Sequence, residues 1–217
     1  RYLAQHYLEA GYRGVGCSRS PVEFELANYE HFCLDISAER DVLNMFAEIR
    51  KGYGRLDVLI NNASVLSRGL LMMTSSNTLK EVFDINVFGT FIACRESSKL
   101  MRRNSFGRII NISTAAVPLA TRGSAVYGAS KAAVEQFFRV LANEVAPFGI
   151  TVNTLGLSFV EGSGMAEAVS EEVIRETLQL TTSKSMVSMG DVAHTLDFLI
   201  SEGSGMVNNQ TLYLGGI

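Results

Sequence analysis

Short, uninterrupted apolar runs recur along the chain and alternate with segments of helical periodicity. The clearest runs are LDVLINNAS at residues 56–64, GRIINIS at 107–113 and ITVNTL at 150–155. A strand with one face in water alternates apolar and polar residues, whereas a strand covered by helices on both faces does not. The pattern therefore predicts a parallel sheet between two layers of helices, a doubly wound α/β sandwich.

The other expected elements follow from apolar periodicity and from residues that begin or end helices. We expect further strands at residues 12–18, 31–35 and 211–215, and helices over the first ten residues, from Ser37 past Ile49, over 78–103, from Tyr127 to Val145, over 171–180 and over 191–200. A chain of 217 residues without repeats or a linker suits one domain, residues 1–217.

The first predicted element is a helix, with Leu3, Tyr7 and Leu8 at helical spacing before Gly11. A doubly wound sheet of this kind instead begins with a strand and a glycine-rich turn, which receives a cofactor pyrophosphate at a helix N-terminus. Without that central strand the sheet would contain two open strand edges. We therefore expect the sequence to be incomplete at its start.

Charge and cysteine usage exclude several classes of partner. A net charge of −3 and a pI near 5.7 give no footprint for nucleic acid. Cys17, Cys33 and Cys94 lie far apart without the paired spacing of a metal site, which favours buried free thiols in a reducing compartment, hence the cytoplasm, and no metal. No apolar run approaches the roughly 20 residues needed to cross a bilayer, so no membrane partner is expected.

Tyr127 and Lys131 stand four residues apart on a predicted helix and therefore share one face. Hydride reduction of a carbonyl leaves an alkoxide that needs a proton, and a phenol can donate it if its pKa, ordinarily about 10, falls toward neutrality. The ammonium of Lys131 would stabilise the phenolate and lower that pKa. The alternative is a packed tyrosine beside a solvated lysine.

Three motifs occur in order in the expected elements: NNAS at 61–64, FDINVFG at 83–89 and YGASK at 127–131. Together they closely resemble the short-chain dehydrogenase/reductase family, over essentially the whole chain. The resemblance implies a Rossmann-like fold, Tyr127 as proton donor, and Lys131 as a holder of the nicotinamide ribose. It also implies that Asn86 holds a water molecule of a proton relay, although surface filler on a helix is the alternative.

The family places a serine hydroxyl thirteen residues before the tyrosine, where this chain has Thr114. Ser113 is one residue off, and adjacent residues of a strand point to opposite faces. We therefore expect Thr114 to hydrogen-bond the substrate oxygen. Threonine keeps the hydroxyl but adds a methyl group and a stiffer side chain.

The resemblance also assigns cofactor-binding residues. In the family, an arginine after the second strand accommodates the 2′-phosphate of NADPH. Arg19, which follows the strand predicted at 12–18, therefore favours NADPH; the alternative is a surface arginine without a role. Asp35 and Ile36 would contact the adenine, although Asp35 is also suited to cap the approach to a helix. Asn61 and Ala63 would line the adenosine side.

Three departures weaken the cofactor assignment more than the fold assignment. Ser64 replaces the last glycine of the usual NNAG motif, and Leu157 and Ser158 replace a Pro-Gly pair expected near the nicotinamide. Gly162 stands where the family has a cofactor-contacting threonine. Residues 159–188 would form an apolar flap over the substrate, or alternatively a helix packed as core.

The leading hypothesis is an NADPH-dependent reductase of a ketone, resembling bacterial 3-oxoacyl-[acyl-carrier-protein] reductases, with a small-molecule or carrier-bound carbonyl substrate. A basic patch could receive an acidic carrier protein, or be a solvated helix end; it comprises Lys99, Arg102, Arg103 and Arg108. The alternatives are a non-catalytic NAD(P)-binding regulatory homologue and an alcohol or sugar dehydrogenase running in the oxidative direction. The helices from Thr78 and from Ala125 resemble those that pair subunits in the family, which implies a homotetramer or dimer.

Overall fold

The computed structural model describes residues 1–24 and 26–217, and its strands form two parallel sheets. The smaller sheet pairs β1 (Gly14–Ser18) with β2 (Tyr29–Cys33), and the larger has the order β3 (Val58–Asn61), β4 (Gly107–Thr114), β5 (Ile150–Leu157), β6 (Thr211–Tyr213). Every strand pairing is parallel, as predicted.

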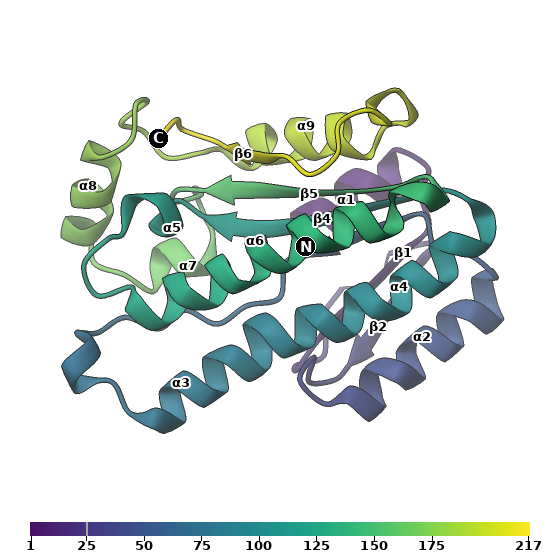
Figure 1. The fold of residues 1–217 in the computed structure, drawn as a ribbon, viewed down its shortest axis with the longest axis horizontal. Coiled ribbons are helices and arrows are strands. Elements are labelled where there is room, and N and C mark those ends of the chain that lie inside the picture. Colours follow the sequence, from purple (N-terminus) through teal and green to yellow (C-terminus); the bar gives the residue numbers. More distant parts are fainter. Residues whose placement is uncertain (25) are drawn as a thin grey trace.

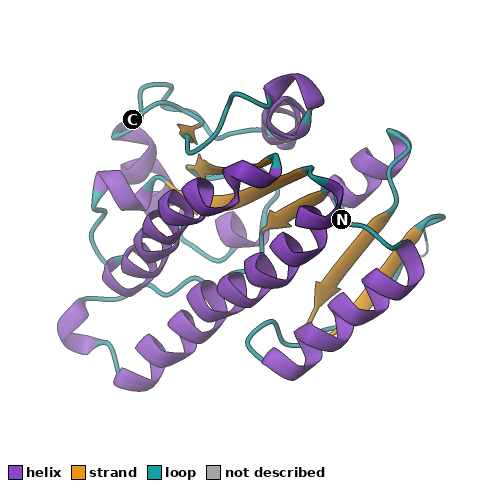
Figure 2. Cartoon of the chain, turned by 45° about the vertical axis from the view of Figure 1, so that its right-hand side comes forward, coloured by secondary structure: helices purple, strands orange, loops and turns teal. Residues whose placement is uncertain are grey.

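Helices cover both faces of the strands, which confirms the doubly wound α/β sandwich (Figures 1 and 2). The helices are α1 (Tyr2–Glu9), α2 (Glu39–Tyr53), α3 (Ser76–Phe83), α4 (Thr90–Asn104), α5 (Ala116–Leu119), α6 (Ala125–Val145), α7 (Gly164–Glu167), α8 (Glu171–Gln179) and α9 (Met189–Ile200). One core lies between the larger sheet and α4 and α6, and a second lies between that sheet and α1 and α9. None of the helices in the described part of the chain is long and apolar enough to cross a bilayer.

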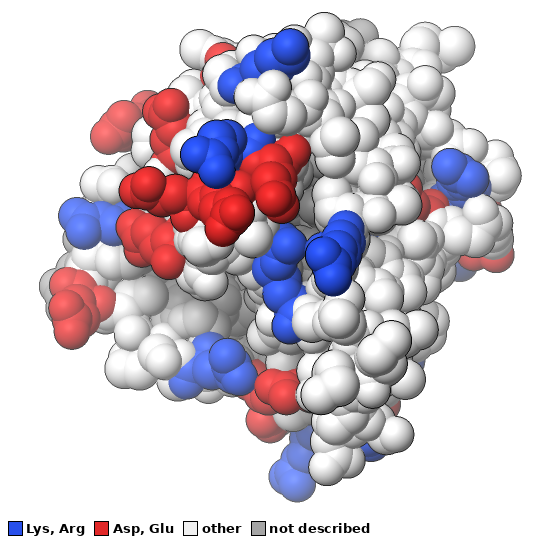
Figure 3. All heavy atoms as spheres, turned by 90° about the vertical axis from the view of Figure 1, so that its left-hand side faces the viewer, with Lys and Arg blue, Asp and Glu red and all other residues white. Residues whose placement is uncertain are grey.

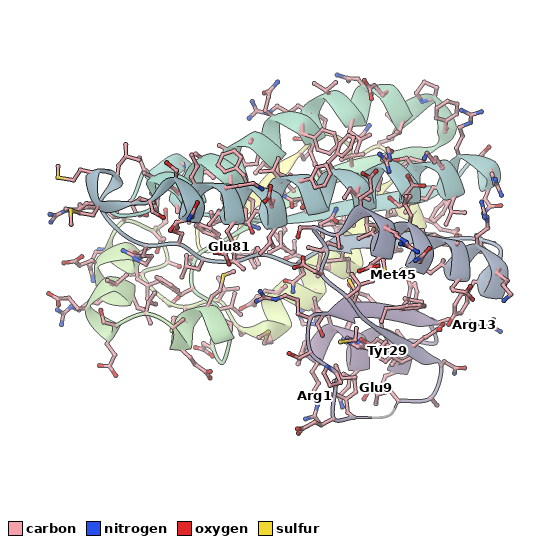
Figure 4. The ribbon with its side chains drawn as sticks, turned by 90° about the horizontal axis from the view of Figure 1, so that it is seen from below. Arg1, Glu9, Arg13, Tyr29, Met45 and Glu81 are labelled. Carbon is pink, nitrogen blue, oxygen red and sulfur yellow. The ribbon has the colours of Figure 1, made fainter. Side chains whose placement is uncertain are left out.

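The two sheets leave open edges that face each other. Within the described residues no strand pairs with the free edge of β1 or of β3. A cleft of about 1600 Å³ runs between these edges and is lined by residues of both, among them Val15 and Leu59. Figure 4 shows Met45, which belongs to α2, and Tyr29, which belongs to β2, on opposite sides of the small sheet.

The long helix predicted over 78–103 is present but is not regular throughout. Between α3 and α4 the residues Asp84–Gly89 form a π-helical turn. The hydroxyl of Thr90 donates to the carbonyl of Asn86 (2.8 Å) at this turn. The spacing of apolar residues still predicted one helix here, because a π turn shifts the apolar face of a helix by only one residue.

Several element boundaries differ from the expectation, two of them around Asp35. The second strand spans Tyr29–Cys33 instead of residues 31–35, and α2 has Ala38 as its N-cap instead of Ser37. The Ser37 hydroxyl and backbone N–H both donate to the Asp35 carboxylate, at 2.7 and 2.9 Å. Ser37 is therefore engaged in the turn before the helix and leaves the cap without a side-chain acceptor.

Parallel strands bring their carboxyl ends to one edge of the larger sheet. Thr114 at the end of β4 pairs with Leu157 at the end of β5, and β3 ends beside them at Asn61. The loops after these strands, the start of α6 and the flap therefore meet at this edge, where open α/β sheets bind their ligands.

Candidate active site

Tyr127 and Lys131 lie one turn apart in the first half of α6, on the face that packs against β4. Both side chains are buried, at 5% and 4% exposure. The Lys131 ammonium donates to the carbonyl of Ile112 (2.8 Å) and lies 5.9 Å from the centroid of the Tyr127 ring. The alternative of a solvated lysine is therefore wrong, and the two side chains are held together as the spacing predicts.

The pKa of the phenol differs from the expectation. Burial raises the pKa of Tyr127 to about 12, against a smaller lowering by hydrogen bonds with the Thr114 and Ser64 hydroxyls. Burial also lowers the pKa of Lys131 to about 8, while the charge of Glu135 acts in the opposite direction. The expected shift of the phenol pKa toward neutrality is thus wrong for the chain alone, because loss of hydration outweighs the neighbouring groups.

The two candidate hydroxyls point to different partners. The Ser113 hydroxyl donates to the buried carboxylate of Glu135 (2.5 Å), away from Tyr127. The Thr114 hydroxyl accepts from the backbone N–H of Ala116 (3.2 Å) and lies close enough to Tyr127 to act against the rise of the phenol pKa. Thr114 is therefore the residue at the tip of the strand whose hydroxyl faces the phenol.

Asn86 is fully packed at the π turn, with 1% exposure. Its Oδ1 accepts from the backbone N–H of Val65 (2.8 Å), and its Nδ2 donates to the carbonyl of Val65 (3.1 Å) and to the Ser130 hydroxyl (3.0 Å). The alternative of a surface amide is wrong. Asn86 instead joins the loop after β3 to the helix that carries Tyr127 and Lys131.

The flap begins and ends at neighbouring backbone positions. Val160 and Val187 form a parallel bridge, and between them lie α7 and α8. The Met165 sulfur accepts a hydrogen bond from the Tyr127 hydroxyl (3.8 Å). Since α8 contains no buried residue and Leu180 is 54% exposed, the interpretation of this segment as packed core is not supported.

The residues assigned to the adenosine end lie on the small sheet and the loop after β3. Arg19, Asp35, Ile36, Asn61 and Ala63 all line the same cleft as Tyr127 and Lys131. The carboxylate of Asp35 is capped by Ser37, and those hydrogen bonds lower its pKa. The amide of Asn61 donates to the Cys94 sulfur (3.3 Å).

The donor set of this cleft fits a nicotinamide dinucleotide at both ends. An arginine lies at the small-sheet end, and the buried ammonium of Lys131 lies at the other. The buried Ser158 hydroxyl, one of the departures from the family, has no hydrogen-bond partner among the described residues. Ser158 follows β5, near the position where the family binds the nicotinamide, so its hydroxyl could hydrogen-bond that ring's carboxamide.

Arg108 does not belong to the exposed basic patch considered as a carrier-protein site. Arg108 is 3% exposed, stacks on Phe106 and donates to the carbonyls of Gly107, Ser201 and Glu202. It is the second residue of β4, so it lies at the opposite end of the sheet from Thr114. Arg108 is therefore a structural residue rather than part of an exposed patch.

Sequence reasoning did not identify two polar neighbours of the pair. The Ser64 hydroxyl reaches Tyr127, and the signal for it was the serine in place of glycine within NNAS. Glu135 lies one helical turn beyond Lys131, and the signal for it was a second polar residue on the buried face of α6.

Known proteins resemble this chain along nearly its whole length. A family model described as Enoyl-(Acyl carrier protein) reductase matches residues 3–216. The chain belongs to the short-chain dehydrogenase/reductase family. It is therefore an NAD(P)-dependent short-chain oxidoreductase.

Relatives within the short-chain dehydrogenase/reductase family include the 3-oxoacyl-[acyl-carrier-protein] reductase of Staphylococcus epidermidis, 30% identical over 196 residues, which cover 89% of this chain and 80% of that protein. The enzyme of that name from Rickettsia bellii is 33% identical over 190 residues, covering 87% and 76%. Among solved structures, ElxO with NADP bound has 26% identity and a TM-score of 0.86, covering 98% of this chain and 90% of that one. A tyrosine-to-phenylalanine variant of ElxO with NADPH bound gives the same identity and TM-score, covering 97% and 90%.

Proposed function

We propose that this protein reduces a ketone to a secondary alcohol with NADPH, and that Tyr127 is the general acid. The observation that carries the proposal is the arrangement of the buried Tyr127 and Lys131 side chains with the half-buried Thr114 at one end of a single cleft. Arg19 and Asp35 line the same cleft at the small sheet, as a dinucleotide would require.

The chain's own residues divide the work of proton transfer. NADPH supplies the hydride. The Thr114 hydroxyl holds the substrate oxygen beside the phenol, and Tyr127 donates the proton to that oxygen. A pKa raised to about 12 keeps the phenol protonated at neutral pH, as a proton donor must be.

Lys131 and Asn86 support this transfer in different ways. Lys131 would hold the ribose and place a positive charge beside the tyrosinate that forms after proton donation. Asn86 fixes Val65 and α6 through three hydrogen bonds. Its Oδ1 accepts one hydrogen bond in this structure, which leaves a lone pair for a relay water.

Arg19 supports NADPH as the cofactor rather than NADH. It follows β1 at the strand's carboxyl end, is exposed, and shares a small hollow with Asp35 and Lys80. A guanidinium can hold a 2′-phosphate with two hydrogen bonds. The NADP and NADPH in the ElxO structures agree with this choice.

The charge around the flap bears on the form of the substrate. Figure 3 shows acidic side chains gathered on the face that carries the flap, with basic side chains among and beside them; α8 contributes the exposed Glu171, Glu172 and Glu176 and one exposed arginine, Arg175. An acidic carrier protein that approached over α8 would meet three carboxylates and one guanidinium, a net repulsion. We therefore favour a small or free thioester ketone over a carrier-bound one.

We also propose a homo-oligomer that pairs the outer faces of α4 and α6. These faces expose an aromatic and aliphatic stripe in which Phe88, Phe91 and Val140 are 41%, 39% and 48% exposed, and Phe91 packs against Phe137 with centroids 6.0 Å apart. A second copy would cover this apolar surface. Sedimentation at micromolar concentration tests it, and a monomer would contradict it.

The experiment for the reaction is NADPH consumption with acetoacetyl thioester, free and carrier-bound, with a panel of small ketones and with crotonyl thioester, a substrate for enoyl reduction. The control is Tyr127→Phe, which should lower turnover by about 10²- to 10⁴-fold while NADPH still binds. Turnover of the crotonyl thioester alone would overturn ketone reduction. NADPH binding without turnover of any substrate would favour the non-catalytic homologue, and NADP-dependent alcohol oxidation alone would favour the oxidative direction.

A further inference from the structure

A buried carboxylate lies beside the proposed proton-transfer site and has no role in the reaction as described so far. Glu135, on α6, is 6% exposed. It accepts hydrogen bonds from the Ser113 hydroxyl (2.5 Å) and from the Tyr213 hydroxyl, at 3.2 Å to Oε1 and 3.3 Å to Oε2. Both partners are neutral O–H donors, so they solvate the carboxylate without cancelling its charge.

A glycine in the larger sheet makes room for the Tyr213 side chain to reach Glu135. Ser113, Gly156 and Tyr213 are paired in one row across β4, β5 and β6. A Cβ atom at Gly156 would lie 2.2 Å from the Tyr213 ring. The glycine therefore lets the ring lie across β5 and its hydroxyl reach Glu135.

Glu135 follows Lys131 by one helical turn and shares its buried face. The Lys131 ammonium donates to the carbonyl of Ile112, the residue before Ser113. Two opposite charges thus lie in the same buried layer between α6 and β4. Burial lowers the pKa of Lys131, and the Glu135 charge raises it in part.

We propose that Glu135 is a positioning residue that keeps Lys131 in its ammonium form at neutral pH. This rests on the proposed function, because Lys131 matters as a cation only if it serves the cofactor and Tyr127. The titratable and charged groups around the carboxylate are Lys131 and Arg139 on α6 and Tyr213 on β6. From β4 it meets the Ser113 hydroxyl.

The test is the titration of Lys131, followed by NMR in protein labelled with ¹³C at the lysine ε carbon. The chain has five lysines, and Lys131→Arg identifies the signal of Lys131. Glu135→Gln keeps the size of the side chain and a carbonyl oxygen but removes the charge. It should lower the midpoint of Lys131 by about one pH unit, a roughly tenfold loss of proton affinity. The basic limb of the NADPH-dependent rate should move to lower pH by the same amount.

Tyr213→Phe is the matched control, because it removes a hydrogen bond to Glu135 and keeps the charge. It should move the Lys131 midpoint by less than Glu135→Gln does. Equal shifts in the two variants, or no shift in a folded Glu135→Gln, would overturn the proposal. If Glu135→Gln does not fold, Glu135→Met removes the same charge from a side chain of similar length: the Lys131 midpoint should again fall, and an unchanged midpoint would overturn the proposal.

These outcomes are separate from the proposed reaction. The lysine titration is read without substrate, so it stands even if no ketone is reduced. A protein that turns over ketones but shows no coupling between Glu135 and Lys131 would lose only the positioning role.

Discussion

The two sheets of this protein differ in how far the polar side chains around them are buried. Around β4, β5 and α6 the polar groups Asn86, Lys131 and Glu135 are nine-tenths buried or more and bonded to protein partners. On the small sheet, Arg19 is exposed and Asp35 is half-buried at a loop. The proposed reacting end of the cleft is therefore fixed by the core, whereas the proposed adenosine end is formed by surface residues. Substitutions should change turnover and folding at the first, and cofactor affinity at the second.

The largest effect is expected from the two adjacent hydroxyls at the end of β4. Thr114→Ala removes the hydroxyl beside Tyr127 and should lower kcat by about 10²-fold, the usual loss for one donor at a developing charge. Thr114→Ser, which keeps the hydroxyl, should retain most of the rate. Ketone-reduction kinetics measure both.

Ser113→Ala is the partner of that experiment. It should change kcat by less than about tenfold but lower the free energy of unfolding by about 1–3 kcal/mol, because a buried acceptor on Glu135 loses its donor. Urea denaturation measures it. A larger loss of rate from Ser113→Ala than from Thr114→Ala would reverse the assignment of the two hydroxyls.

A substitution at the other end of the cleft should separate affinity from folding. Arg19→Ala should weaken NADPH binding by about 10- to 100-fold, as for one charge-assisted contact, and leave NADH binding and the melting temperature unchanged. Cofactor fluorescence titration measures it. Arg40→Ala on the exposed face of α2 is the control, and equal losses in both variants would show that only net charge matters.

The same change of glycine to alanine should have opposite signs in the two regions. Gly156→Ala places a Cβ against the Tyr213 ring and should lower the free energy of unfolding by about 1–3 kcal/mol. Gly52→Ala in α2, where a Cβ meets no atom within 4 Å, should raise it by about 0.5–1 kcal/mol. Urea denaturation of the two variants tests the contrast, and a tolerated Gly156→Ala would show that β5 and β6 can separate.

The smallest effect is a pH dependence. Lys131 has a pKa of about 8 in the fold and 10.5 as its ordinary value, so it loses its charge as pH rises through 8. The rate of reduction should fall to about half near pH 8. The stability contribution of Lys131 has the opposite sign: between pH 8 and 10.5 the unfolded chain binds more protons, so stability rises with pH. Rate profiles, and unfolding of wild type and Lys131→Met at several pH values, would test both, and a flat rate to pH 9 would contradict the first.

The sequence predicted the sheet, its parallel strands and the long helices, because apolar runs and helical stripes report burial directly. It also placed Thr114 beside Tyr127 and Ser113 away from it. It could not predict the π turn or the raised pKa of Tyr127. Both depend on contacts between distant segments: the clamp of Asn86 on Val65, and burial of the phenol beneath Met165.

Ser37 and Arg108 show a related limit. Their residue types suggested a helix cap and a surface patch, but each is held by other partners: Ser37 by Asp35, and Arg108 by carbonyls at the far end of the sheet. Composition indicates which contacts a side chain is able to make. Only the fold determines which neighbour is within reach.

The bridge between Val160 and Val187 holds the two ends of the flap together, so the segment between them can change in sequence and length without moving the core. These two ends leave the core side by side, with Glu161 N–H bonded to the carbonyl of Val187 and Val187 N–H bonded to that of Phe159, both at 2.9 Å. Closing a loop between fixed ends costs only about 0.6 kcal/mol more for each doubling of its length. Insertions, deletions or whole replacements between these two valines can therefore diversify what enters the cleft while the strands and α6 keep their geometry.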